Sequence, residues 1–357
     1  MPPEQRALPQ RPQVGPPPAW VPSMHGVSIA LVVVLVLFAT IFQTSLAPGT
    51  GAGEKSNNGS AVNASGTPGA LTPTPTGDGT LAMAGPSPEA SPAVVANVGA
   101  DTEPILPNYR IVSYYGHPND DTMGILGQFN KQDLLEQLMD EAAAYERADP
   151  SRPVMPAFEI VFSVAQSDPG ADGKYLLHTD DATMRDYIQF TQENNILLII
   201  DIQFGKSTVQ DEMAMIEDYL REPNVHLAID PEFAWGPDQQ PGDFGTVDAT
   251  AINYAQDELA RIVAENNLPP KVLVVHRFTD GMVTNIKKVK QVENVQFVLD
   301  FDGFGDPVSK QQGYDLYVRD GGVPYGGIKL FYDQDKPLMK PEDVVDLEPA
   351  PDFVMYQ

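Results

Sequence analysis

The sequence predicts a (β/α)8 barrel, or TIM barrel, over residues 105–357. Eight short, strongly apolar segments recur along this part of the chain. Segments with helical periodicity separate most of them. The part is also close to the length of about 250 residues that is typical of this fold. Several of the eight segments are almost wholly apolar, as strands buried on both faces of a parallel sheet should be.

The predicted strands are rich in β-branched and other apolar residues. In chain order they are 110–116, 157–165, 196–203, 225–232, 271–277, 295–302, 326–332 and 352–357. Helices are predicted between them where apolar residues recur at helical spacing. These cover 131–147, 182–194, 208–221, 248–267, 282–292, 310–319 and 341–347. The printed sequence ends at the eighth strand, so we expect a barrel that lacks the closing eighth helix.

An open, doubly wound sheet is the alternative fold, because it also alternates strands and helices. Such sheets commonly bind nucleotides through a glycine-rich loop that follows a strand. Neither a GxGxxG nor a GxxxxGK[ST] motif occurs in this chain. The barrel is therefore the favoured prediction.

The N-terminal part predicts a membrane anchor. Residues 27–46 are twenty uncharged and mostly apolar residues, enough to cross the roughly 30 Å hydrocarbon core as a helix. This run exceeds the 7–15 residues usual in a cleaved signal peptide, which is the alternative. Arg6 and Arg11 precede it, and only Lys55 follows closely. The positive-inside rule then predicts a single-pass protein of the cell membrane with its C-terminal domain outside.

Three N-terminal segments follow from this reading. Residues 1–24 form a cytoplasmic, proline-rich tail, and 25–47 form the transmembrane helix. Residues 48–104 are rich in Pro, Gly, Ser, Thr and Ala and cannot bury enough apolar surface to fold. We expect them to be a disordered linker that holds the domain 105–357 away from the membrane.

Charge and cysteine content exclude several functions. The whole chain carries a formal charge of −27, and 43 of its 49 acidic residues fall within 105–357. Such a field repels polyanions, so we expect no nucleic-acid partner. The chain has no Cys, which excludes disulfides, Cys-ligated zinc and thiolate catalysis.

Acidic residues gather where the predicted strands end, which is where active sites of this fold form. They are Asp201, Asp230, Glu232, Asp300 and Asp302. Residues spaced by two share a face of a strand, so these carboxyls should ring one mouth of the barrel. They cannot all ionise at close range, so one should keep its proton and be suited to general acid catalysis. Loop capping is the alternative role for any single Asp.

Further strand-end residues suggest substrate contacts. They are His117, Gln203, His276 and Tyr332, together with Asp201 from the acidic set and Trp235 three residues after Glu232. Aromatic rings beside carboxylates suit sugars, which present apolar C–H faces and hydroxyl edges. The alternative for a single ring is that it packs a long loop.

Two resemblances bear on function. The Asp230-Pro231-Glu232 sequence resembles the D-x-E motif of secreted barrel lysozymes, and a Glu acid/base at strand four is common in retaining barrel glycosidases. Val225 and Ala228 occupy acidic positions of the fuller chitinase pattern D-x-x-D-x-D-x-E, which is therefore not met. Through YYGHP, HLAIDPEF and LDFDGFGDP the chain also resembles a family of secreted or membrane-anchored bacterial barrel proteins that has no assigned activity.

The sequence therefore predicts a glycoside hydrolase-like enzyme that acts on a cell-envelope or extracellular polysaccharide. Glu232 would be the general acid, Asp230 would tune it, and Asp300 or Asp302 would be the nucleophile or base. No cofactor and no metal are expected. One alternative is a metal-dependent hydrolase, although no HxH, HExxH or DxDxDG pattern occurs. The other is a non-catalytic barrel that binds a glycan or a partner protein.

Overall fold

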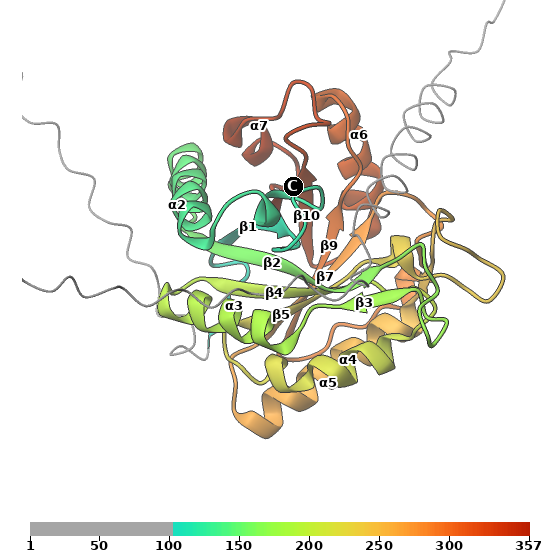
Figure 1. The fold of residues 1–357 in the computed structure, drawn as a ribbon. Helices are drawn as coiled ribbons and strands as arrows, with labels where there is room; N and C mark the ends of the chain where they lie inside the picture. Colours follow the sequence, from blue (N-terminus) through green and yellow to red (C-terminus); the bar gives the residue numbers. More distant parts are fainter. Residues whose placement is uncertain (1–102) are drawn as a thin grey trace, which may run out of the picture. The chain divides into compact units, whose positions relative to one another are not determined.

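The computed structural model describes residues 103–357, which form a closed barrel of parallel strands (Figure 1). The eight strands are β1 Arg110–Gly116, β2 Val154–Ala165, β4 Leu197–Ile202, β5 Val225–Ile229, β7 Lys271–Arg277, β9 Val295–Phe301, β10 Tyr325–Leu330 and β11 Phe353–Tyr356. Each pairs in parallel with its neighbours, and β1 pairs with both β2 and β11. The predicted parallel barrel is thus confirmed.

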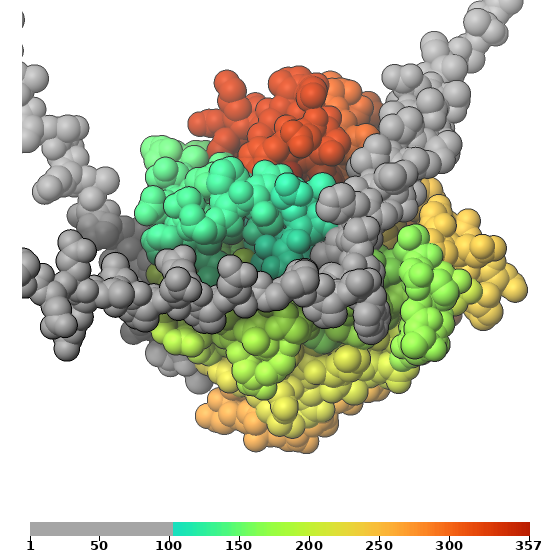
Figure 2. All heavy atoms as spheres, in the orientation of Figure 1, coloured from blue at the N-terminus to red at the C-terminus, as the bar shows by residue number. Residues whose placement is uncertain are grey.

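Helices cover the outside of the barrel. They are α2 Lys131–Ala148, α3 Asp181–Glu193, α4 Val209–Leu220, α5 Ala249–Asn266, α6 Pro307–Tyr317 and the short α7 Pro341–Val345. Most begin at a residue whose side chain accepts hydrogen bonds from the first-turn N–H groups, such as Asn130 before α2 and Asp306 before α6. Figure 2 shows side by side the first part of the barrel sequence, in blue-green, and the last part, in red. This agrees with the pairing of β1 with β11.

The predicted helix over 282–292 is wrong. Two short strands, β6 Val247–Asp248 and β8 Val283–Thr284, pair in parallel there, and the 3-10 helix η4 Ile286–Lys288 follows. Asn285 has a φ of 55°, in the left-handed region, which stops an α-helix from forming across it. Its side chain donates instead to Asp248 Oδ2 at 2.6 Å.

One short strand and several 3-10 helices lie in the connections between the barrel strands. Strand β3, Leu176–His178, pairs antiparallel with the end of β2. Three further 3-10 helices are η2 Ile125–Gly127, η3 Pro231–Phe233 and η5 Arg319–Gly321. Of these, η3 matters most for the site, because it directly follows β5 at the barrel mouth.

The barrel interior changes character along its axis. Side chains alternate along a strand, so every second residue points inward. Toward the amino ends of the strands the inner residues are apolar and fully buried, as with Ile111, Ala157, Ile199 and Val274. Continuing two residues along these four strands reaches the polar or charged side chains of Ser113, Glu159, Asp201 and His276. The apolar half forms a floor beneath them.

Three predicted segments cannot be described. The tail 1–24, the transmembrane helix 25–47 and nearly all of the linker 48–104 lie outside the described residues. Within 103–357, no helix is both long enough and apolar enough to cross a membrane.

Candidate active site

Charged and polar side chains fill the carboxyl-terminal end of the barrel. On the strands themselves they are Tyr115, Glu159, Asp201, His276, Asp300 and Lys329. Asp230 and Asp302 directly follow β5 and β9, and Glu232 lies in η3. The alternation of side chains along each strand explains why these residues point inward. Glu159 lies two residues after the inward-facing Ala157, and His276 lies two residues after the inward-facing Val274. These nine residues are called the mouth cluster below.

His276 is the centre of the mouth cluster. Its Nε2 lies 3.1 Å from Glu159 Oε1, and its Nδ1 lies 3.3 Å from Asp300 Oδ2 and 3.7 Å from Asp302 Oδ2. Burial alone would lower the pKa of His276, but its contacts with Asp300 and Glu159 outweigh burial and raise the pKa well above its usual value. While no metal ion is bound, these contacts therefore favour the protonated imidazole.

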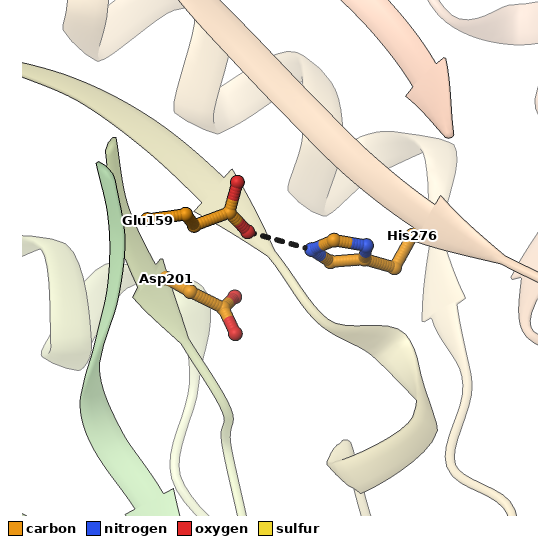
Figure 3. A group of neighbouring side chains, drawn as sticks. All are labelled: Glu159, Asp201 and His276. Carbon is orange, nitrogen blue, oxygen red and sulfur yellow. Dashed lines mark hydrogen bonds and ion pairs between the residues drawn. The ribbon is translucent and has the colours of Figure 1, made fainter. Parts of the chain in front are cut away.

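Asp201 lies beside this pair (Figure 3). It is fully buried, and Tyr115 donates from its hydroxyl to Asp201 Oδ2 at 3.4 Å. Burial, opposed by the charge of His276, raises the pKa of Asp201 to about 7. The Lys329 Nζ lies 3.8 Å from the centroid of the Tyr115 ring, and its charge acts on Asp201 to lower the pKa of that carboxyl.

Glu232 stands at the rim and is partly exposed, unlike most of the mouth cluster. Asp230 begins η3, and its side chain accepts from the Glu232 backbone N–H at 3.1 Å. This hydrogen bond fixes the backbone conformation that positions Glu232. The pKa of Glu232 is raised well above its usual value, mainly by loss of solvent and then by the charges of Asp230 and Asp302. Burial similarly raises the pKa of Asp230 to about 6 and that of Asp302 to about 7.

The charge balance of the cluster is uneven. Six carboxyls, those of Glu159, Asp201, Asp230, Glu232, Asp300 and Asp302, share the space with two basic side chains, His276 and Lys329. Burial makes uncompensated negative charge costly, so the carboxyls must retain protons or attract a cation. The site is therefore able to hold an acid that stays protonated beside ionised carboxylates.

Three of the predicted substrate-binding residues use their polar atoms to hold loops. His117 Nδ1 accepts from the Asn119 N–H at 3.2 Å, so its Nε2 carries the proton toward Thr179 Oγ1 at 3.1 Å. Gln203 Oε1 accepts from the Ala165 N–H at 2.8 Å. Trp235 is 7% exposed and donates to the Asp243 carbonyl at 2.9 Å.

Two more of the predicted substrate-binding residues, Asp201 and His276, belong to the mouth cluster. The last, Tyr332, lines a separate pocket of about 530 Å³ beside α2. Its ring is 39% exposed and stacks on Tyr356, with ring centroids 5.3 Å apart. Tyr114 and Glu141 also line this pocket. An exposed aromatic ring in such a setting can bind the face of a ligand.

Two charged members of the mouth cluster were not predicted from the sequence. Glu159 and Lys329 lie inside the apolar runs 157–165 and 326–332, whereas the predicted site residues lie at strand ends. The sequence does contain a signal for both. Each is the one charged residue in an otherwise apolar strand, and each lies an even number of residues from inward-facing residues of the same strand. Glu159, Asp201 and His276 also bring one possible metal-ligand atom each to within 4.8 Å of one another.

Comparison with known proteins adds little. No family model matches the chain, and no curated protein matches it. Among solved structures, it is similar to a hyperthermophilic endo-beta-1,4-glucanase solved in complex with substrate. That match has 9% sequence identity and a TM-score of 0.30, and it covers 57% of this chain and 77% of the glucanase chain. So weak a likeness carries no argument about chemistry, and the resemblance to a bacterial barrel family stays a prediction.

Proposed function

We propose that the barrel is the catalytic domain of a glycoside hydrolase-like enzyme that acts on a cell-envelope or extracellular polysaccharide. In this proposal residues 25–47 anchor the protein in the cell membrane, 48–104 tether the barrel, and the barrel faces the outside. The polysaccharide would enter at the carboxyl ends of the strands, where loops and partly exposed side chains surround the mouth cluster.

The state of Glu232 carries the proposal. A general acid must reach the leaving-group oxygen and must hold its proton at the working pH. Glu232 is partly exposed at the rim, and burial with the nearby charges of Asp230 and Asp302 raises its pKa well above the usual value. It therefore meets both requirements in one side chain.

The other carboxyls take complementary roles. Asp302 is 8% exposed and close enough to Glu232 for its charge to raise the pKa of that side chain, so it is the candidate nucleophile or base. Asp300 is fully buried behind it and contacts His276, so it is placed to support rather than to attack. Asp230 tunes Glu232 through its charge and its hydrogen bond to the Glu232 N–H.

The test is a pH–rate profile of the full chain on envelope polysaccharides, with Glu232→Gln and Asp230→Asn beside the wild type. Gln keeps the shape of the side chain but cannot deliver a proton, so hydrolysis should fall by about 10²–10⁴-fold. The loss should be smaller on an aryl glycoside, whose leaving group needs less protonation. Glu258→Gln, on the outer helix α5, should be unaffected.

The sign of the pH effect follows from the raised pKa of Glu232. Activity should decline as pH rises through the pKa of Glu232, because the acid form is then lost. It should also decline at low pH, because burial raises the pKa of Asp302 to about 7 and its protonated form cannot act as nucleophile or base. Asp230→Asn removes a charge that raises the pKa of Glu232, so the decline at high pH should begin at a lower pH. Wild-type rates in Glu232→Gln at every pH would exclude the acid role. Tight glycan binding without hydrolysis by the wild type would indicate a binding module instead.

A further inference from the structure

We propose that Glu159, Asp201 and His276 bind one divalent cation of the first transition series, such as Mn²⁺ or Zn²⁺, inside the barrel (Figure 3). The three residues come from β2, β4 and β7 and point toward one another. They are fully buried or nearly so. The proposal does not depend on glycoside hydrolysis, since neither Glu232 nor Asp302 is among the ligands.

The spacing of the donor atoms suits such an ion. Bonds from Zn²⁺ to His nitrogen and carboxylate oxygen are about 2.0–2.2 Å long, so adjacent ligands lie roughly 3.0–3.4 Å apart, depending on the coordination angle. The distance from Glu159 Oε1 to His276 Nε2 is 3.1 Å. Asp201 completes the set, since the three ligand atoms all lie within 4.8 Å of one another. A small movement of one carboxylate would close the site.

Unpartnered buried oxygens give a second, independent observation. Glu159 Oε2 and Asp201 Oδ1 make no hydrogen bond to any described residue, although both side chains are fully buried. Buried polar atoms almost always have a partner, because leaving them without one costs free energy. A cation between these two carboxylates, bound by both oxygens of Glu159 and by Asp201 Oδ1, would supply the missing partners and neutralise both charges.

The surroundings orient the three ligands as metal sites usually do. A metal-bound His commonly presents its other ring nitrogen to a carboxylate, which fixes the tautomer. Here His276 Nδ1 faces Asp300 Oδ2 at 3.3 Å, which leaves Nε2 for the ion. Tyr115 donates to Asp201 Oδ2 at 3.4 Å and so leaves Oδ1 free. One nitrogen and two carboxylate oxygens favour Mn²⁺, Fe²⁺ or Zn²⁺ over softer ions.

Cation binding can be measured without any activity. The full chain is stripped with a chelator and then dialysed against MnCl₂ or ZnCl₂, and the bound metal is counted per chain. We expect one saturable ion. Glu159→Gln and Asp201→Asn each remove a charged ligand, and each should weaken binding by tenfold or more.

Glu212→Gln is the matched control. Glu212 is also fully buried, and its Oε2 lies 2.8 Å from His178 Nε2, so it forms a comparable Glu–His pair. This variant should bind the ion as the wild type does, because Glu212 does not belong to the trio Glu159, Asp201 and His276.

Two results would overturn the proposal. One is a wild-type chain that binds no saturable ion, which would leave His276 as a cation held directly by Glu159. The other is equal binding by the wild type and both trio variants, which would mean an adventitious ion. If both trio variants fail to fold, the proposal is tested by the visible spectrum of Co²⁺ added to the stripped wild type. A visible spectrum of a nitrogen-and-oxygen site that saturates at one equivalent supports the site, and the spectrum of free aqueous Co²⁺ excludes it.

Discussion

A buried ion pair behind the mouth gives the sharpest stability prediction. Lys310, on α6, is fully buried, and its Nζ lies 3.5 Å from Asp335 Oδ2. The same ammonium donates to the carbonyls of Gly303, at 2.6 Å, and of Lys329. Asp335 in turn accepts from backbone N–H groups on both sides, one of them Gly305 at 2.7 Å. The pair thus joins the loop after β9 to the end of β10.

Lys310→Met keeps the aliphatic stem but removes the charge and the donors. The change leaves Asp335 as a buried carboxylate without its cation, and two carbonyls lose a partner. Removing one member of a buried ion pair typically costs about 3–5 kcal/mol. For a domain of this size 1 kcal/mol shifts Tm by roughly 2–4 °C, so a fall of about 6–20 °C is expected.

The assay is urea and thermal unfolding of the wild type, Lys310→Met, Asp335→Asn and the double variant. The two sites are in contact, so the double variant should lose less stability than the sum of the single losses. Lys290→Met is the control, because Lys290 lies the same 3.5 Å from Asp257 but both side chains are exposed. Its loss should be about 0–1 kcal/mol. A loss below about 1 kcal/mol in Lys310→Met, or strict additivity, would refute the reasoning.

Two further predictions concern the mouth and the domain boundary. In Gly327→Ala the new Cβ would lie 2.5 Å from Asp300 Oδ1, so we expect overpacking to cost about 1–3 kcal/mol, measured by urea unfolding. Gly281→Ala, which meets nothing within 4 Å, should show no such loss, and an equal loss in both would contradict the steric argument. A chain that starts at Glu103 should be soluble, monomeric and cooperatively folded, whereas the full chain should sediment with membranes; aggregation of the shorter chain alone would show that the boundary is misplaced.

The fold was predictable because the barrel strands are distinct in sequence. Segments such as 196–203 and 271–277 are almost wholly apolar, which is what strands covered on both faces require. The true structure of 282–292, which was predicted to be a helix, could not be predicted in the same way. Its apolar residues suit a helix locally, but pairing of Val283 with Val247 and the left-handed turn at Asn285 depend on a segment far along the chain.

The candidate site was predictable in part for a similar reason. Strand ends converge in any parallel barrel, so Asp201, Asp230 and Asp302 could be expected to meet. Glu159 required knowing which face of β2 points inward, and that parity depends on register with β1 and β4. The hydrogen bonds that hold His117 and Trp235 in loops depend on backbone groups whose positions a sequence pattern does not give.

Closure of the ring by β1 and β11 has a consequence for how the protein is made. Ile111 pairs with Phe353, and Arg110 donates to the Pro351 carbonyl at 3.0 Å, across almost the whole length of the barrel sequence. During synthesis, β1 leaves the ribosome long before its partner exists, so a nascent barrel carries two open sheet edges until the last strand arrives. Such distant pairings also slow folding. The barrel should therefore be most prone to aggregation just before β11 emerges, when a chaperone that shields β1 would help it most.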